Sequence, residues 1–225
     1  MWRSWMSVVP VVLAALAADS EPPARFLALG DSYTIGEGVA AAENWPHQLA
    51  AALRARGVAI AEPDIVARTG WTTDELSAAM DAHTFHPPYG LVTLLIGVNN
   101  QYRGRDLQNY RDEFRALLER AVALAGGDPR RVVVVSIPDW GVTRFGRESG
   151  RDLAQIAREI DAFNVAAARV SAELQARHVD VTAISRDRGD TAGMLAADGL
   201  HPSAAMYARW TAEIIPQARM ALGGR

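Results

Sequence analysis

The sequence contains two short stretches, LVTLLI at residues 91–96 and RVVVVSI at residues 131–137, in which nearly every side chain is apolar. Stretches of this length without polar alternation are typical of strands in a parallel sheet that is covered on both faces. Shorter or more mixed runs occupy residues 26–29, 59–67 and 179–184. We therefore predict a strand in each of these five stretches.

Helical spacing marks the longer stretches between the predicted strands. Apolar residues recur every three or four positions over residues 107–122 and 153–174, which gives each stretch one apolar face. A further helix is predicted to begin after Asn44, and a last one covers residues 204–222, where Pro216 is expected to kink or break it. Alternating strands and helices without a linker or repeat predict one α/β domain, a doubly wound parallel sheet between two helical layers.

The N-terminal stretch differs from the rest of the chain. Arg3 is followed by an uncharged run over residues 4–18 that ends in small side chains. This pattern predicts a secretory signal at residues 1–18 and a single mature domain at residues 19–225, located in the periplasm or outside the cell. The alternative is an uncleaved anchor, although the run is short for a bilayer span and Pro10 interrupts it.

The composition excludes several classes of protein. The 225 residues carry a net charge of −3, with 22% charged and 49% hydrophobic residues, which fits neither a disordered chain nor a basic nucleic-acid binder. The absence of cysteine excludes disulfides, thiol nucleophiles and thiolate metal sites. His47, His83 and His86 lack the spacing of metal ligands, so we predict no metal site.

A candidate nucleophile follows the first predicted strand, which runs directly into Gly30, Asp31 and Ser32. A serine at a strand-to-helix turn exposes its hydroxyl at the carboxyl edge of the sheet, near a helix start that favours negative charge. The alternative interpretation of Ser32 is an ordinary helix N-cap.

A candidate base lies near the other end of the chain, where Asp198 precedes His201 by three residues. A carboxylate at this spacing can hold the imidazole tautomer while the ring accepts a proton from a serine. The pair follows a long polar loop after the last predicted strand, and such loops are often functional. A chance pair on a solvated loop is the alternative.

Two further strand ends carry candidate donors for an oxyanion. Gly70 follows the second strand and exposes a bare backbone N–H, and Asn99 follows the third with a side-chain amide. Each residue is also common in simple turns. Because ligands bind at the carboxyl ends of the strands in a doubly wound sheet, we expect all these positions to converge there.

These motifs resemble those of the SGNH, or GDSL, hydrolases: Gly-Asp-Ser after the first strand, a lone Gly after the second, Gly-x-Asn after the third and Asp-x-x-His near the end. The resemblance implies a flavodoxin-like, five-stranded parallel sheet. It implies Ser32 as nucleophile, His201 as base and Asp198 as the residue that orients it. The backbone of Ser32 and Gly70 and the amide of Asn99 would form the oxyanion hole. It further implies hydrolysis of a small-molecule ester or thioester without a cofactor, with lipid, aryl and acetylated-carbohydrate substrates all open.

Two positions depart from the family pattern. Tyr33 replaces the leucine of the name motif and is expected to border the cleft. Asn100 replaces the usual aspartate after Asn99, which puts in doubt the hydrogen bond that a carboxylate would accept there. Other aromatic residues in loops after strands, which either wall the cleft or pack in the ordinary way, are Trp71, Tyr102 and Trp140.

Two alternative functions use the same fold. Gly36 and Gly38 fit a degenerate dinucleotide fingerprint, with Glu62 placed as a ribose-binding acid, but the fingerprint should follow its strand directly. A binding module that has lost catalysis is the second alternative, although every expected reactive residue is present.

Overall fold

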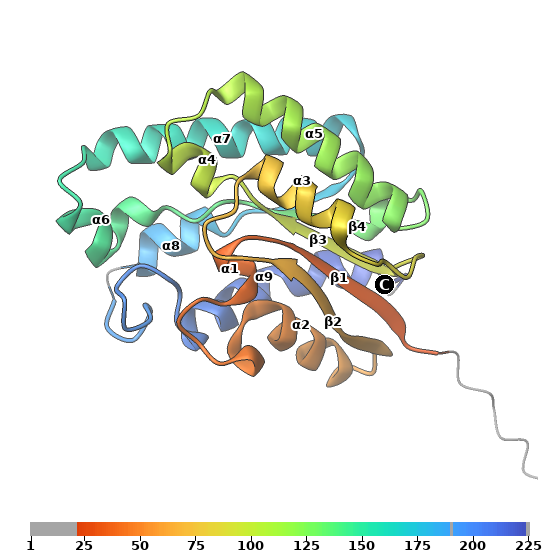
Figure 1. The fold of residues 1–225 in the computed structure, drawn as a ribbon. Coiled ribbons are helices and arrows are strands. Elements are labelled where there is room, and N and C mark those ends of the chain that lie inside the picture. The colour runs from red at the N-terminus through yellow and green to blue at the C-terminus, as the bar shows by residue number, and fades with distance from the viewer. Residues whose placement is uncertain (1–21, 190, 224–225) are drawn as a thin grey trace, which may run out of the picture.

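The computed structural model describes residues 22–189 and 191–223, and it forms a three-layer α/β/α domain (Figure 1). The predicted signal at residues 1–18 lies outside the described residues. The central sheet has five parallel strands in the order β2-β1-β3-β4-β5, which is the flavodoxin-like order. The strands are β1 (Ala24–Gly30), β2 (Ile60–Ala67), β3 (Leu91–Leu95), β4 (Val132–Val135) and β5 (Arg177–Val179).

Helices cover both faces of the sheet (Figure 1). One layer holds α2 (Trp45–Arg54), α8 (Thr182–Arg188) and α9 (Ala204–Ala221). The opposite layer holds α3 (Thr73–Ala82), α5 (Leu107–Leu124) and α7 (Leu153–Glu173). Three short helices lie in loops that follow strands, namely α1 (Ser32–Ile35), α4 (Val98–Tyr102) and α6 (Arg144–Glu148). Single 3-10 turns are Ala41–Glu43, Pro129–Arg131 and Trp140–Val142.

Burial explains why the sequence pattern identified this fold. Every residue of β3 and β4 is buried, as expected for strands that are covered on both faces. The predicted apolar faces of α5 and α7 pack against each other through residues such as Tyr110 and Phe163, whose ring centroids lie 4.5 Å apart. The predicted doubly wound architecture is therefore confirmed.

The strand predicted at residues 179–184 is wrong in most of its length. Only Val179 belongs to β5, and the chain turns at Asp180 into α8. The Asp180 carboxylate accepts hydrogen bonds from the Thr182 N–H at 2.7 Å and from the Ser136 hydroxyl at 3.0 Å. A local cap of this kind competes with strand extension, so the segment before Asp198 includes a helix and is not the featureless loop that we expected.

The last helix also differs from its prediction. Helix α9 continues through Pro216 without a break, although proline removes one backbone donor from its interior. Its buried face includes Trp210 and Ile214, and this packing onto the sheet stabilises the helix on both sides of the proline. Within the described part of the chain, every helix is either too short or too polar to cross a lipid bilayer.

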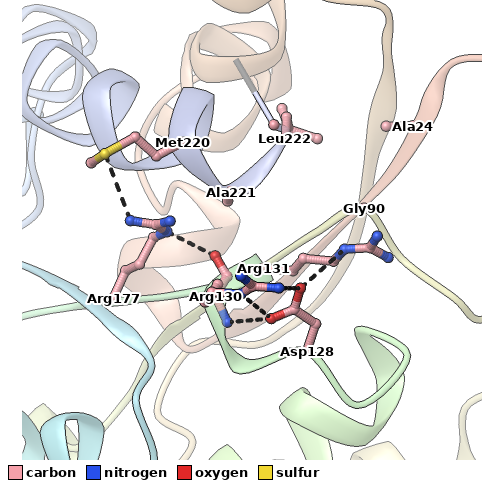
Figure 2. Close-up of a pocket in the computed structure, with 10 residues that line it drawn as sticks. Ala24, Gly90, Asp128, Arg130, Arg131, Arg177, Met220, Ala221 and Leu222 are labelled. Atoms are coloured by element: carbon pink, nitrogen blue, oxygen red, sulfur yellow. Dashed lines mark hydrogen bonds and ion pairs between the residues drawn. The ribbon is translucent and has the colours of Figure 1, made fainter. Parts of the chain in front are cut away.

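A cavity of about 490 Å³ lies at the amino edge of the sheet, where β1, β4 and β5 begin and α9 ends (Figure 2). Arg130, Arg131 and Arg177 line it, together with Asp128. Arg130 holds the Asp128 carboxylate through two hydrogen bonds of 2.9 and 3.0 Å. Arg177 donates to the Arg130 carbonyl oxygen at 2.7 Å. Arg130 and Asp128 are therefore paired with each other, and Arg177 is held by the backbone of Arg130.

Candidate active site

A second, smaller cavity of about 230 Å³ lies at the carboxyl edge, where β1, β2 and β3 end. Four predicted site residues from separate parts of the chain line it: Ser32, Gly70, Asn99 and His201. Asp198 joins them through a hydrogen bond to His201. The structure thus brings together all five residues that the sequence singled out for chemistry.

Ser32 occupies a tight turn between β1 and α1. Gly30 must be a glycine, because a Cβ there would lie 2.6 Å from the Leu95 carbonyl oxygen of the neighbouring strand. The Asp31 carboxylate caps α1 by accepting the Tyr33 N–H at 3.0 Å, so the cap is Asp31 and not Ser32. The Ser32 hydroxyl is therefore free of a capping role, and Ser32, which is 5% exposed, lines the cavity.

Asp31 is unusual among the carboxylates of the protein. It is completely buried, and its Oδ2 has no hydrogen-bond partner among the described residues. Burial raises its pKa to about 7, against the opposing effect of the Tyr33 N–H hydrogen bond. A carboxyl group that holds its proton near neutral pH therefore stands directly before the candidate nucleophile.

His201 and Asp198 form a close pair. The His201 Nδ1 lies 2.6 Å from Asp198 Oδ2, and Asp198 Oδ1 accepts the backbone N–H of His201 at 3.0 Å. Burial acts to raise the pKa of Asp198, but the hydrogen bonds from the His201 ring and from nearby backbone N–H groups outweigh it and hold the pKa below its usual value. An ionised carboxylate at Nδ1 keeps the ring proton on that atom, which leaves Nε2 as an acceptor.

The loop that carries this pair is held on both sides. Leu195 and Pro202 form an isolated antiparallel bridge, and the Ala196 N–H donates to the His201 carbonyl oxygen at 2.8 Å. From α6, the Phe145 N–H donates to the Gly199 carbonyl oxygen at 3.0 Å. The imidazole is thus fixed by its own loop and by a neighbouring helix, as a group that must act at one point requires.

Backbone donors face the cavity from two strand ends. Gly70 has φ +87°, a left-handed conformation that favours glycine, and a Cβ there would approach only the Arg103 side chain, at 3.8 Å. Within the described residues, no hydrogen bond uses the backbone N–H of Gly70 or of Ser32. Both N–H groups are therefore available to a negatively charged oxygen.

Asn99 contributes a side-chain donor. Its Nδ2 donates one hydrogen bond to the Trp71 carbonyl oxygen at 2.9 Å, which fixes the amide and leaves the second N–H of the same nitrogen available.

Asn100 ties two of these loops together. It is fully buried, its Oδ1 accepts the Thr73 N–H at 3.1 Å, and its Nδ2 donates to the Thr73 hydroxyl at 2.7 Å. The acceptor function that the substitution of aspartate put in doubt is therefore present. Sequence reasoning did not identify this role, because the partner at the start of α3 is distant in the chain.

The remaining walls of the cavity are mostly apolar. Of the four predicted cleft residues, Tyr33, Tyr102 and Trp140 line it, whereas Trp71 does not and instead packs against the core. Val98, Phe145 and Leu200 also line the cavity and were not predicted. The signal for Phe145 was weak, because it lies on α6, a helix of five residues with no apolar periodicity.

The geometry does not favour the nucleotide-binding alternative. Gly36 is the C-cap of α1 with φ +82°, so the glycine follows the short helix and does not lie between strand and helix, as a dinucleotide fingerprint requires. Across residues 22–189 and 191–223, no three acidic, histidine or cysteine side chains group in a way that could hold a metal ion.

Comparisons with known proteins agree with this architecture. The chain is similar to the crystal structure of TesA, with 22% identity, a TM-score of 0.69, and coverage of 88% of this chain and 99% of that one. It is similar to a lipase/acylhydrolase from Enterococcus faecalis, with 20% identity, a TM-score of 0.67, and coverage of 88% and 96%. It also resembles Axe2, an acetylxylan esterase from Geobacillus stearothermophilus, with 18% identity, a TM-score of 0.66, and coverage of 91% and 96%. A comparison with curated protein sequences gives no match.

At these identities, the solved structures establish the fold. The model of the GDSL-like lipase/acylhydrolase family matches residues 28–209, a range that holds every residue of the cavity described above. The chain therefore belongs to the GDSL-like lipase/acylhydrolase family.

Proposed function

We propose that this protein is a serine hydrolase that cleaves carboxylic esters, with Ser32 as nucleophile, His201 as general base and Asp198 as its orienting carboxylate. The observation that carries the proposal is the convergence of Ser32, His201 and the donors of Gly70 and Asn99 on one cavity.

Each residue has a defined part in the proposed reaction. His201 Nε2 takes the proton of the Ser32 hydroxyl as the oxygen attacks the acyl carbon. The carbonyl oxygen becomes an oxyanion, which accepts hydrogen bonds from the backbone N–H groups of Ser32 and Gly70 and from the Asn99 amide. His201 then gives its proton to the leaving alcohol.

Water completes the cycle by the same route. It loses a proton to His201 as it attacks the acyl-enzyme, the acid is released, and His201 returns the proton to Ser32. Throughout, Asp198 keeps the ring oriented and stabilises its positive charge, since the Nδ1 contact of 2.6 Å is already formed in the free protein. Every step uses groups of this chain, the ester and water.

The first experiment tests the nucleophile. Purified protein is exposed to a fluorophosphonate probe and, separately, to short p-nitrophenyl esters. We expect covalent labelling and turnover by the wild type, and a loss of turnover of about 10⁴-fold or more in Ser32→Ala, because the nucleophilic hydroxyl is removed.

The matched control is Ser203→Ala. Ser203 does not line the cavity, and its hydroxyl caps α9. The substitution should lower stability by about 1 kcal/mol and leave labelling in place. Wild-type protein that is neither labelled nor active would favour the catalytically inactive binding module over the enzyme.

A further inference from the structure

One of the aromatic side chains that line the apolar cavity at Ser32, Tyr102, also lines a second cavity of about 490 Å³. The residue is 40% exposed, and the other residues that line the second cavity include Arg103, Asp152 and Glu159. Tyr102 therefore separates an apolar compartment that holds the nucleophile from a larger polar one.

Neighbouring groups hold the Tyr102 ring in this position. The Arg151 guanidinium lies 4.2 Å from the ring centroid and donates to the Tyr102 carbonyl oxygen at 3.0 Å. Trp140 and Phe145 pack against the ring with centroid distances of 5.4 and 6.5 Å. A cation stacked on one face and two aromatic neighbours restrict the ring to one orientation.

The wall behind Tyr102 is fixed as well. Gln101 is buried, accepts the Trp140 indole N–H at 2.8 Å and donates to Glu159 at 2.7 Å. These bonds fasten Trp140 to α7. Tyr102 is thus the exposed residue of a wall whose buried part is held by the hydrogen bonds of Gln101.

The position of Tyr102 in the site indicates which part of an ester it meets. It lies three residues after Asn99 on α4, so the two side chains share one face of the helix. In the proposed mechanism, Asn99 holds the oxyanion, while the alcohol leaves toward His201. Tyr102 shares the helix of Asn99 and not the loop of His201, and on that ground it is assigned to the acyl side of the scissile bond.

We infer that Tyr102 ends the acyl-binding compartment, that Arg151 is a positioning residue that holds it there, and that the enzyme consequently selects esters of short acyl chains. The volume agrees, because about 230 Å³ is below the range of about 300 to 1,000 Å³ that is typical of sites for larger ligands. This inference rests on the proposed function, since it assigns the acyl side from the roles of Asn99 and His201.

The test measures kcat/KM for p-nitrophenyl acetate, butyrate and octanoate. We expect the wild type to prefer acetate or butyrate over octanoate by about tenfold or more. Tyr102→Ala should raise the octanoate-to-acetate ratio by about tenfold, because the chain can then extend past the former wall. Tyr102→Phe keeps the ring and should keep the wild-type ratio.

Arg151 provides the second, independent variant. Arg151→Ala should raise the octanoate-to-acetate ratio by about threefold, since the ring loses its stacked cation, and Arg151→Lys should restore the wild-type ratio. Arg169→Ala, which removes an exposed arginine farther along α7, is the matched control and should leave the ratio unchanged.

A parallel series of acetate esters with increasingly long alcohols separates the two sides of the bond. A shift in Tyr102→Ala that appears in the alcohol series and not in the acyl series would overturn the inference, as would an unchanged acyl ratio in both alanine variants. Those results leave the wild-type esterase activity intact. A wild type that cleaves no ester and takes up no fluorophosphonate would instead contradict the proposed function.

Discussion

The two edges of the sheet carry cavities of very different character. The amino-edge cavity is about twice as large and is lined by three arginines, while the carboxyl-edge cavity holds the serine, the histidine and the aromatic walls. At the amino edge, Arg130 and Asp128 satisfy each other. At the carboxyl edge, the cavity is lined by Ser32 and Gly70, whose backbone N–H groups have no hydrogen-bond partner among the described residues. The volume and charge of a cavity therefore identify the candidate site less well than the presence of several polar groups that are free to bind a ligand.

Two carboxylates show the same contrast. The Arg130 hydrogen bonds hold the pKa of Asp128 below its usual value, and this half-buried residue lines the amino-edge cavity. Burial raises the pKa of Asp31, beside the nucleophile, to about 7. The charged groups Arg130 and Asp128 at the amino edge are thus paired, and such a partly exposed pair contributes little to stability. At the carboxyl edge, the burial of Asp31 in the strand-to-helix turn lowers the stability of the fold.

The largest expected effect on activity comes from substitutions at the carboxyl edge of the sheet. His201→Ala should lower kcat/KM by about 10⁴-fold or more, because it removes the proposed acceptor of the Ser32 proton. Asp198→Asn should lower it by a smaller factor, since the proposed role of Asp198 is to orient the ring and not to receive the proton. Steady-state kinetics with a short p-nitrophenyl ester measure both. Equal losses would show that Asp198 does more than orient.

The second prediction concerns the stability cost of Asp31. Its folded-state pKa is raised from 3.8 to about 7, so between about pH 4 and 7 the unfolded chain loses a proton that the folded protein keeps. Stability should therefore fall with rising pH by up to about 1.4 kcal/mol per pH unit from this group. Asp31→Asn should lack this contribution.

Urea unfolding of both proteins at several pH values across this window provides the measurement. We expect the Asn variant to be the more stable one near pH 7, with the difference shrinking toward pH 4. Parallel stability curves for the two proteins would mean that Asp31 ionises normally. Asp128→Asn serves as the matched substitution at the amino edge and should lack this pattern, since the pKa of Asp128 is lowered.

The smallest expected effect lies at the amino edge itself. Arg177→Ala should change kcat/KM by less than about twofold, because surface substitutions far from a site usually have small effects. Its contacts, at 2.7 Å to the Arg130 carbonyl oxygen and 3.2 Å to Gln217, are local to that edge. A large loss of activity would show that the two edges are coupled.

Much of the site could be predicted from sequence because its residues directly follow buried strands. The apolar runs at residues 91–96 and 131–137 locate the sheet, and a parallel sheet brings its carboxyl ends to one edge. Ser32, Gly70 and Asn99 are placed by that rule alone. His201 does not directly follow a strand. It could be predicted only because Asp198 precedes it by three residues.

The unpredicted features depend on contacts between distant segments. Apolar residues favoured a strand at residues 179–184, but the chain turns into α8 where the Asp180 carboxylate accepts the Thr182 N–H. Trp71 looked like a cleft residue by its position, yet its ring packs against the core and only its carbonyl oxygen serves the site. The roles of Asn100 and Phe145 likewise arise from partners that spacing in the sequence does not reveal.

Asp198 and His201, the proposed carboxylate and base, lie within four residues of a single loop, while two of the aromatic side chains that line the cavity, Tyr102 and Phe145, come from α4 and α6. Part of the cavity wall is therefore encoded apart from the proposed base, although Leu200 adjoins His201 and Asn99 shares α4 with Tyr102. Under the proposed function, a few substitutions at Tyr102 and Phe145 would change the range of esters without altering Ser32, Asp198 or His201. A small library of variants at residues 102 and 144–151 is therefore expected to differ in the esters that they cleave.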